Sequence, residues 1–184
     1  MEIAKLSANG LRIKGKKATL LLDVTDVKKT DANAYLFLKE DAQKIGYTTD
    51  GVLIYEPGDY EICGVKISVS RYANLVCYEL IIDGIHMLIA NASSITSGKE
   101  KMNEQQMLLL YADTVIDQSA ITNLSPMITI SYGEKATDLA KSLGKGLGKK
   151  DTEEGNVDAE IKPVEKFTAV LEKLPSELLV VLLE

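Results

Sequence analysis

The chain is 184 residues long, with 46% hydrophobic residues, 26% charged residues and a formal net charge of -6. This length allows one domain, residues 1–184, to bury its core without a metal or a disulfide. The acidic balance disfavours nucleic acid, and the absence of a long apolar run or a secretory signal predicts a cytoplasmic protein that does not bind membranes.

The first elements read as short strands. Apolar residues alternate through residues 2–23, which turn at Asn9-Gly10 and again at Gly15-Lys16, so we expect a meander. Asn-Gly is among the strongest hairpin signals because both residues tolerate positive φ. Residues 34–38, Ala-Tyr-Leu-Phe-Leu, form a continuous apolar run that is typical of a strand buried on both faces.

Two hairpins are predicted next. Residues 55–67 hold a Pro-Gly turn and then Cys-Gly between two short alternating runs, and the strands 76–82 and 85–90 are joined by Asp-Gly. Such dipeptides suit two-residue turns between antiparallel strands. Cys63 and Cys77 lie in these runs without a redox or zinc-binding spacing, so we expect free, largely buried thiols in a reducing compartment.

The second half predicts helices between strands. Ser-Gly-Lys-Glu at residues 97–100 is a capping-box pattern, from which a helix is expected to extend to about Tyr111. Strands at 114–116 and 127–130 would then be joined by only nine residues, which is short for a parallel crossover, so either a connecting helix has shrunk to a turn or the strands pair differently. The remainder reads as a helix at 134–143, a flexible loop at 144–162, a helix opened by Pro163 and a last strand at 178–183.

Several stretches carry a family resemblance. They are Arg-Ile-Lys-Gly-Lys-Lys-Ala-Thr-Leu-Leu-Leu-Asp at 12–23, Pro-Gly-Asp-Tyr-Glu-Ile-Cys-Gly-Val at 57–65, Ile-Asp-Gly at 82–84 and Pro-Val-Glu-Lys-Phe at 163–167. The chain thereby resembles small bacterial metal-dependent hydrolases of the metallo-β-lactamase superfamily, in the branch of the L-ascorbate-6-phosphate lactonases. The resemblance implies an α/β fold, an αββα sandwich of two mixed sheets with helices on the outer faces.

The resemblance also implies that the metal ligands of the family are lost. The family places a His-x-His-x-Asp-His motif after the strand at 34–38 and adds further histidines and an aspartate from later loops, which together hold two divalent metals. This chain has two lysines in that motif, where dications would sit. The positions implied for ligands or neighbouring motif residues are Ala8, Lys39, Glu40, Asp41, Gln43, Lys44, Ala73, Asn91, Ala92 and Ser131.

The number of histidines argues against the metal-dependent activity of the family. The chain has one, His86, whereas a dinuclear centre of this family uses about five imidazoles. Strand alternation puts His86 opposite its apolar neighbours, as expected for a structural or surface residue. We therefore expect no metal, no cofactor and no catalytic residue, and a pseudoenzyme that binds another protein or itself. The alternative is a divergent hydrolase of phosphate esters or lactones that uses Glu40, Asp41, Lys39 or Lys44 without zinc.

Overall fold

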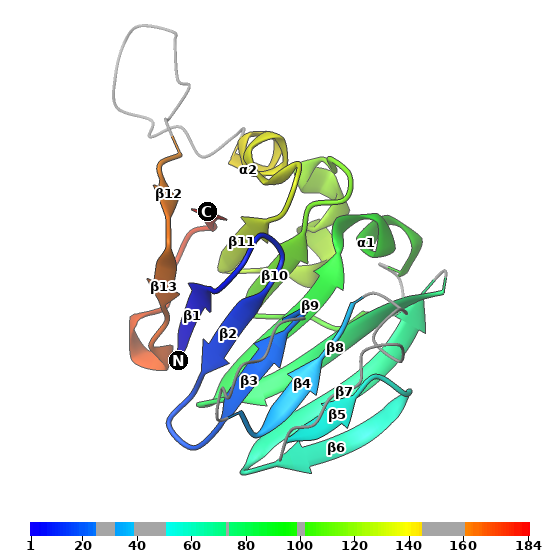
Figure 1. The fold of residues 1–184 in the computed structure, drawn as a ribbon. Helices are drawn as coiled ribbons and strands as arrows, with labels where there is room; N and C mark the ends of the chain where they lie inside the picture. Colours follow the sequence, from blue (N-terminus) through cyan, green and yellow to red (C-terminus); the bar gives the residue numbers. More distant parts are fainter. Residues whose placement is uncertain (25–31, 39–50, 73, 99–101, 145–160) are drawn as a thin grey trace, which may run out of the picture.

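Two mixed β-sheets stacked face to face form the body of the molecule (Figure 1). The computed structural model describes residues 1–24, 32–38, 51–72, 74–98, 102–144 and 161–184. Within these residues, one sheet has six strands and the other has eight. The two-sheet sandwich that we expected is therefore confirmed, whereas nearly all of the predicted loop at 144–162 lies outside the described residues.

The six-stranded sheet has the order β13-β1-β2-β3-β4-β5. Its strands are β1 (Glu2–Lys5), β2 (Leu11–Lys14), β3 (Thr19–Leu22), β4 (Ala34–Leu36), β5 (Val52–Ile54) and β13 (Lys166–Thr168). β1, β2 and β3 are antiparallel neighbours, which confirms the predicted meander, and β3, β4 and β5 are parallel. The turn between β1 and β2 is closed by the Leu6 amide, which donates to the Gly10 carbonyl at 2.8 Å.

The eight-stranded sheet has the order β12-β14-β11-β10-β9-β8-β7-β6. Its strands are β6 (Gly58–Ile62), β7 (Val65–Tyr72), β8 (Leu75–Ile82), β9 (Ile85–Asn91), β10 (Met107–Tyr111), β11 (Ile128–Tyr132), β12 (Pro163–Val164) and β14 (Leu179–Leu183). β6 to β9 form an antiparallel meander. From β9 to β12 the neighbours are parallel, so the carboxyl ends of these strands meet at one end of the sandwich.

Both predicted hairpins of this sheet are confirmed. Cys63 and Gly64 have φ values of 50° and 81°, and Asp83 and Gly84 have 52° and 82°. Positive φ at both central residues is the type I′ geometry that matches the twist of the flanking strands. Both turns therefore have the geometry that their Cys-Gly and Asp-Gly dipeptides predict.

The two cysteines differ in their surroundings, and one expectation was wrong. Cys63 is exposed because it lies in the β6–β7 turn, not in a strand. Cys77 is buried in β8, where its thiol lies 3.4 Å from the hydroxyl of Ser94. Burial raises the pKa of Cys77 to about 11, so this thiol stays protonated and unreactive.

The core between the sheets is built from the inward residues of alternating strands. Ile13 and Leu20 of the six-stranded sheet and Ile67, Leu80 and Met87 of the eight-stranded sheet belong to one continuous apolar cluster. All five are at most 1% exposed. This burial is the main stabilising contribution to the sandwich.

Helices cover part of the outer face of the eight-stranded sheet. α1 (Ala92–Gly98), α2 (Ala136–Gly144) and two 3-10 turns (Gln118–Ala120 and Thr122–Leu124) pack on that face in a second apolar cluster. β10 and β11 are consequently buried on both faces along their whole length. In the part of β7 to β9 beyond this cluster, outward residues such as Lys66 and His86 are exposed.

The predicted helix from residue 97 to Tyr111 is wrong. Ser97 and Gly98 end α1, and residues 107–111 form β10. The run Met-Leu-Leu-Leu-Tyr has no helical period because the strand is buried on both faces. The strand predicted at 114–116 is absent as well, and β10 joins the parallel β11 through the two 3-10 turns.

The helix predicted after Pro163 is also wrong. β12 and β13 occupy this segment, and a 3-10 turn, η4 (Leu171–Lys173), follows. β12 pairs with β14 and β13 pairs with β1, so consecutive residues close one edge of each sheet. Tertiary pairing outweighs the apolar spacing that suggested a helix. The predicted helix at 134–143 and the last strand are confirmed as α2 and β14.

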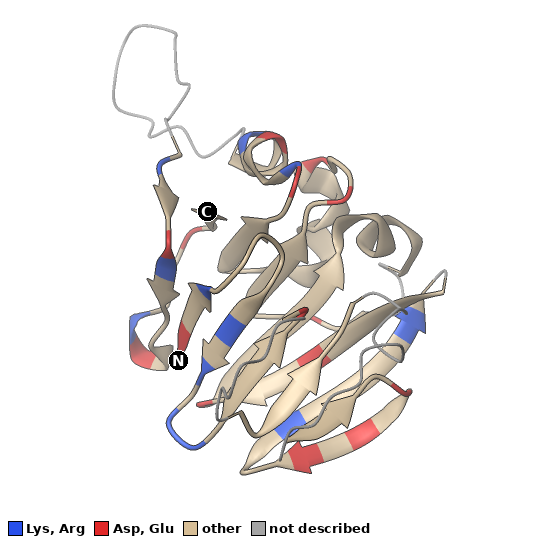
Figure 2. Cartoon of the chain, viewed as in Figure 1, with Lys and Arg blue, Asp and Glu red and all other residues tan. Residues whose placement is uncertain are grey.

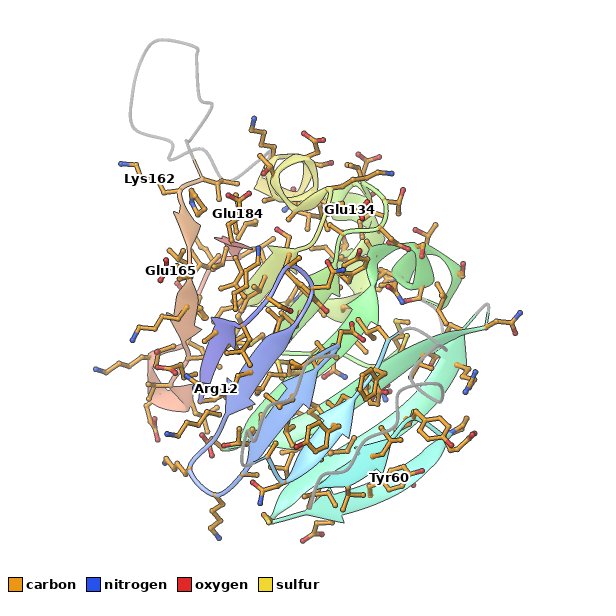
Figure 3. The ribbon with its side chains drawn as sticks, in the orientation of Figure 1. Arg12, Tyr60, Glu134, Lys162, Glu165 and Glu184 are labelled. Atoms are coloured by element: carbon orange, nitrogen blue, oxygen red, sulfur yellow. The ribbon has the colours of Figure 1, made fainter. Side chains whose placement is uncertain are left out.

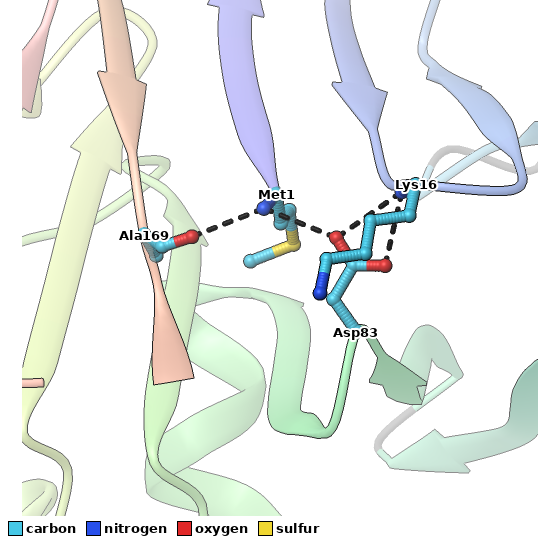
Figure 4. A network of polar contacts seen from close by, with 4 residues as sticks. All are labelled: Met1, Lys16, Asp83 and Ala169. Carbon is cyan, nitrogen blue, oxygen red and sulfur yellow. Dashed lines mark hydrogen bonds and ion pairs between the residues drawn. The ribbon is translucent and has the colours of Figure 1, made fainter. Parts of the chain in front are cut away.

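A partly exposed polar network ties the two sheets together at the end opposite α1 and α2 (Figure 4). The Asp83 carboxylate, from the β8–β9 turn, accepts hydrogen bonds from the Lys16 amide at 3.0 and 3.2 Å. It also lies 3.1 Å from the Met1 ammonium, which donates to the Ala169 carbonyl at 3.0 Å. Burial by itself raises the pKa of Asp83, but the Lys16 amide and the ammonium outweigh burial and lower the pKa.

Replacement of Asp83 should therefore destabilise the protein. We expect Asp83→Asn to lower the free energy of unfolding by about 1 kcal/mol at neutral pH, because it removes the charged partner of the Lys16 amide and the Met1 ammonium in a partly exposed network. Since folding lowers the pKa of Asp83, its contribution is present above the usual value of 3.8 and is lost as the pH falls through the folded value. Urea unfolding from pH 7 to pH 3 measures this difference, with the exposed Asp59→Asn as control. Equal stability of Asp83→Asn and Asp59→Asn at pH 7 would contradict it.

Candidate functional site

The candidate site lies where the parallel strands of the eight-stranded sheet end. Asn91 is the last residue of β9, Tyr111 that of β10 and Tyr132 that of β11. They are register partners across the three strands, and Tyr111 and Tyr132 face the core between the sheets. In α/β folds ligands commonly bind at the carboxyl ends of such strands. The row formed by Asn91, Tyr111 and Tyr132, which we call the tyrosine row, is therefore the described part of the candidate site.

Aromatic side chains fill this end of the sandwich. The rings of Tyr111 and Tyr132 meet edge to face, with centroids 5.5 Å apart and an angle of 69° between their planes. Asn91, Tyr111 and Tyr132 are 4%, 5% and 0% exposed. The Tyr111 ring also leaves no room for a Cβ at Gly133, whose φ of 98° already disfavours a larger residue. The described strand ends thus form a packed layer, not an open cleft.

The hydroxyl of Tyr132 is buried without a hydrogen-bond partner in the described part of the chain. Burial, and secondarily the negative charge of Asp23, raise the pKa of Tyr132 well above its usual value. The phenol is therefore neutral at physiological pH. A neutral hydroxyl in this layer is a poor metal ligand and a poor base.

Asp23 reaches the same region from the end of β3. Its carboxylate accepts a hydrogen bond from the Leu38 amide at 3.0 Å, and its own φ of 50° is left-handed. Nearby, the Tyr78 hydroxyl accepts from the Phe37 amide at 2.9 Å and lies 2.8 Å and 2.9 Å from the carbonyls of Phe37 and Ile54. These contacts hold the segment after β4 in place, so both polar groups have structural partners.

The predicted site residues are only partly brought together. Asn91 ends β9 and Ala92 begins α1, next to the tyrosine row, while Ala8 is exposed in the β1–β2 turn. Ser131 is buried on the other face of β11, where its hydroxyl lies 3.2 Å from the Ala136 carbonyl and 3.4 Å from the Val181 carbonyl. The positions that lie outside the described residues are Lys39, Glu40, Asp41, Gln43, Lys44 and Ala73.

Sequence reasoning missed the tyrosine row and Asp113. Asp113 follows β10 and accepts a hydrogen bond from the Ser93 amide at 3.0 Å and a short one from the Ser93 hydroxyl. It therefore satisfies the amino end of α1. Tyr132 directly follows the implied ligand position at Ser131, and the alternation of β11 would have placed Tyr132, not Ser131, on the inner face.

A shallow hollow of about 400 Å³ lies beside the β1–β2 turn. Lys5, Leu6, Ser7, Glu165 and Glu184 line it. Figure 3 shows Glu165 and Glu184 on the same side of the molecule. The hollow offers two carboxylates and one ammonium, without the imidazole or thiol groups that bind zinc.

The donor groups of the described residues do not fit a dinuclear zinc centre. Among the described residues no three His, Cys, Asp or Glu side chains are placed to hold a metal ion. The tyrosine row and Asp23 supply only oxygen donors, and Asp23 already accepts from Leu38. As predicted from strand alternation, His86 is exposed while Ile85 and Met87 are buried. We therefore derive no metal-dependent step from these residues.

No protein-family model matches the chain, and no match was found among curated proteins. Its structure is similar to that of a proposed Zn-dependent hydrolase of the metallo-β-lactamase superfamily from Thermotoga maritima, with a TM-score of 0.70, 15% identity and coverage of 100% of this chain and 98% of that chain. It is also similar to a proposed metal-dependent hydrolase from Parabacteroides distasonis, with a TM-score of 0.56, 16% identity and coverage of 79% and 89%. The chain has the metallo-β-lactamase fold, as the sequence predicted. In the described part of the chain no helix has the length and apolar character needed to cross a bilayer.

Proposed function

We propose that this metallo-β-lactamase-fold chain is a pseudoenzyme, a divergent relative of the lactonase-like hydrolases that has lost their metal centre and acts by binding or assembly. The observation that carries the proposal is the row of Asn91, Tyr111 and Tyr132 across three parallel strand ends. These residues carry one amide and two phenol side chains, and each residue is at most 5% exposed.

The ligand requirements of metal-dependent hydrolysis support the proposal that the metal centre is lost. Hydrolysis in such a site needs a metal that lowers the pKa of bound water, held by imidazole or carboxylate ligands with an open position for substrate. The tyrosine row supplies no ionised ligand. The sequence has one histidine, His86, which is exposed on the outer face of β9. A retained sandwich whose described strand ends carry no such donor set supports a use of the fold other than metal-dependent hydrolysis.

A hydrolysis screen tests the proposal against its alternative. We expect no turnover of ester, lactone or phosphodiester substrates above the buffer rate, with or without added zinc or manganese. Lys39→Ala and Asp41→Ala serve as the matched variants, because the divergent-hydrolase alternative needs these side chains. Turnover that disappears in either variant would show that the chain is a hydrolase and would overturn the proposal.

A further inference from the structure

A hollow on the outer face of the eight-stranded sheet is independent of the candidate site. It measures about 400 Å³, within the size range of ligand-binding clefts, and spreads over β6, β7, β8 and β9. Cross-strand register brings Glu61, Lys66, Ile81 and His86 into one row across these four strands. We call this hollow the β6–β9 groove. α1 and α2 pack elsewhere on the same face.

The extended segment before β10 forms a wall of the β6–β9 groove. Gln105 is 5% exposed and its amide nitrogen lies 3.5 Å from a carboxylate oxygen of Glu79. Asn103 approaches the same oxygen at 3.5 Å, and the side-chain oxygen of Gln106 accepts from the His86 amide at 2.9 Å. The amide groups of Asn103 and Gln105 therefore lie beside the Glu79 carboxylate in the groove.

The charge of the groove selects a basic ligand. Its lining holds the carboxylates of Asp59, Glu61 and Glu79 but one ammonium group, that of Lys66. Figure 2 shows the two acidic positions on β6, at the margin of the molecule. Opposite charges facing one another across adjacent strands stabilise pairing, and like charges oppose it. A cationic side chain laid over β6 would meet Asp59 and Glu61.

The free edge of β6 selects an extended ligand. β6 is the last strand of its sheet in the described part of the chain, so its outer edge offers backbone groups for another strand. Asp59 and Glu61 are exposed on it, while Tyr60 packs against the core. A second copy of β6 would set these carboxylates against their own counterparts. This repulsion disfavours self-pairing and leaves a basic strand as the complementary partner.

We propose that the β6–β9 groove and the edge of β6 bind an extended basic segment of a partner protein, which adds a strand to β6 and places Lys or Arg side chains beside Asp59 and Glu61. This inference deepens the proposed binding function and rests on it. The contact differs from the sandwich end, where Tyr111 and Tyr132 lie, so each can be tested without disturbing the other.

A labelled peptide of eight alternating lysines and valines tests the inference by fluorescence anisotropy. We expect it to bind, and to bind about tenfold more weakly to the double variant Asp59→Asn/Glu61→Gln, a loss of about 1.4 kcal/mol. The double variant Glu172→Gln/Glu177→Gln changes the net charge equally at exposed positions outside the groove and should bind as the wild type does. Equal weakening in both double variants would mean non-specific attraction and would overturn the inference.

Two further ligands test the strand pairing and the source of the cation. The same peptide with N-methyl groups on alternate residues keeps its charge but loses one hydrogen-bonding edge, and should bind at least about tenfold more weakly. Spermine, a flexible polycation without a peptide backbone, should not displace the peptide at equal charge concentration. Undiminished binding of the methylated peptide, or full displacement by spermine, would contradict strand addition.

The failures of the two proposals are distinguishable. A chain that hydrolyses substrates with a bound metal and also binds the basic peptide would overturn the pseudoenzyme proposal alone. A chain without metal or turnover that ignores the peptide would overturn this inference alone. The melting temperature of each variant provides the control for folding, because Asp59 and Glu61 are exposed and their amide replacements should leave it unchanged.

Discussion

Tyr132→Ala should lower the free energy of unfolding by about 3–5 kcal/mol, the usual cost of deleting a buried aromatic side chain. Tyr132 is fully buried and its ring packs edge to face against Tyr111. Removal of the ring would leave a cavity at the strand ends and remove that aromatic contact. Urea unfolding monitored by circular dichroism measures the change.

Tyr132→Phe separates the ring from its hydroxyl. Because this hydroxyl has no partner in the described part of the chain, its removal should change stability by less than about 1 kcal/mol, in either direction. A loss of several kcal/mol in Tyr132→Phe would show that the hydroxyl binds a group essential to the fold. That result would contradict the packed layer on which the proposed loss of chemistry rests.

Tyr78→Phe should have the second large effect, a loss of about 1–3 kcal/mol of unfolding free energy. The Tyr78 hydroxyl reaches from β8 of one sheet to Phe37 and Ile54 at the other sheet and is the hydrogen-bond partner of their backbone groups. Phenylalanine keeps the ring but leaves the carbonyl of Ile54 without this donor in the interior. Tyr60→Phe, which removes an exposed bond to the Glu56 carbonyl, is the matched control. Equal stability of the two variants would contradict the role of Tyr78.

Because of Tyr78, we also expect the free energy of unfolding to fall at alkaline pH. Burial raises the pKa of Tyr78 far above its usual value of 10.0, against the opposing effect of the hydrogen bond with Phe37. A group whose pKa is raised by folding contributes stability that is present below its unfolded pKa and is lost as the pH rises toward the folded value. Unfolding measured between pH 8 and pH 11 should show this fall in the wild type and a smaller fall in Tyr78→Phe.

Local turn chemistry explains which parts of the fold are predictable from the sequence. Cys63-Gly64 and Asp83-Gly84 adopt positive φ within their own dipeptides, so both hairpins follow from neighbouring residues. The strand β10 does not follow from its local sequence, because residues 107–111 are apolar throughout and only pairing within the sheet distinguishes a strand from a helix. β12 and β13 likewise depend on pairing with β14 and β1, distant in sequence.

The candidate site was predictable only in part for the same reason. The resemblance implied Asn91 and Ala92, and the structure places both at the strand ends. The row that joins Asn91 to Tyr111 and Tyr132 depends on the register of three parallel strands, which no local pattern specifies. The face of a strand matters equally, because Ser131 is next to Tyr132 yet packs toward α2.

Metal content tests the central claim most directly. The protein should be purified without chelator, its zinc, manganese and iron measured by mass spectrometry, and its melting temperature recorded with and without each added metal. A specific ligand at 100 times its Kd adds about 2.7 kcal/mol to the stability of the folded chain, so a retained centre would raise the melting temperature. We expect substoichiometric metal and no such rise. Near-stoichiometric metal with a rise would contradict the loss of the metal centre.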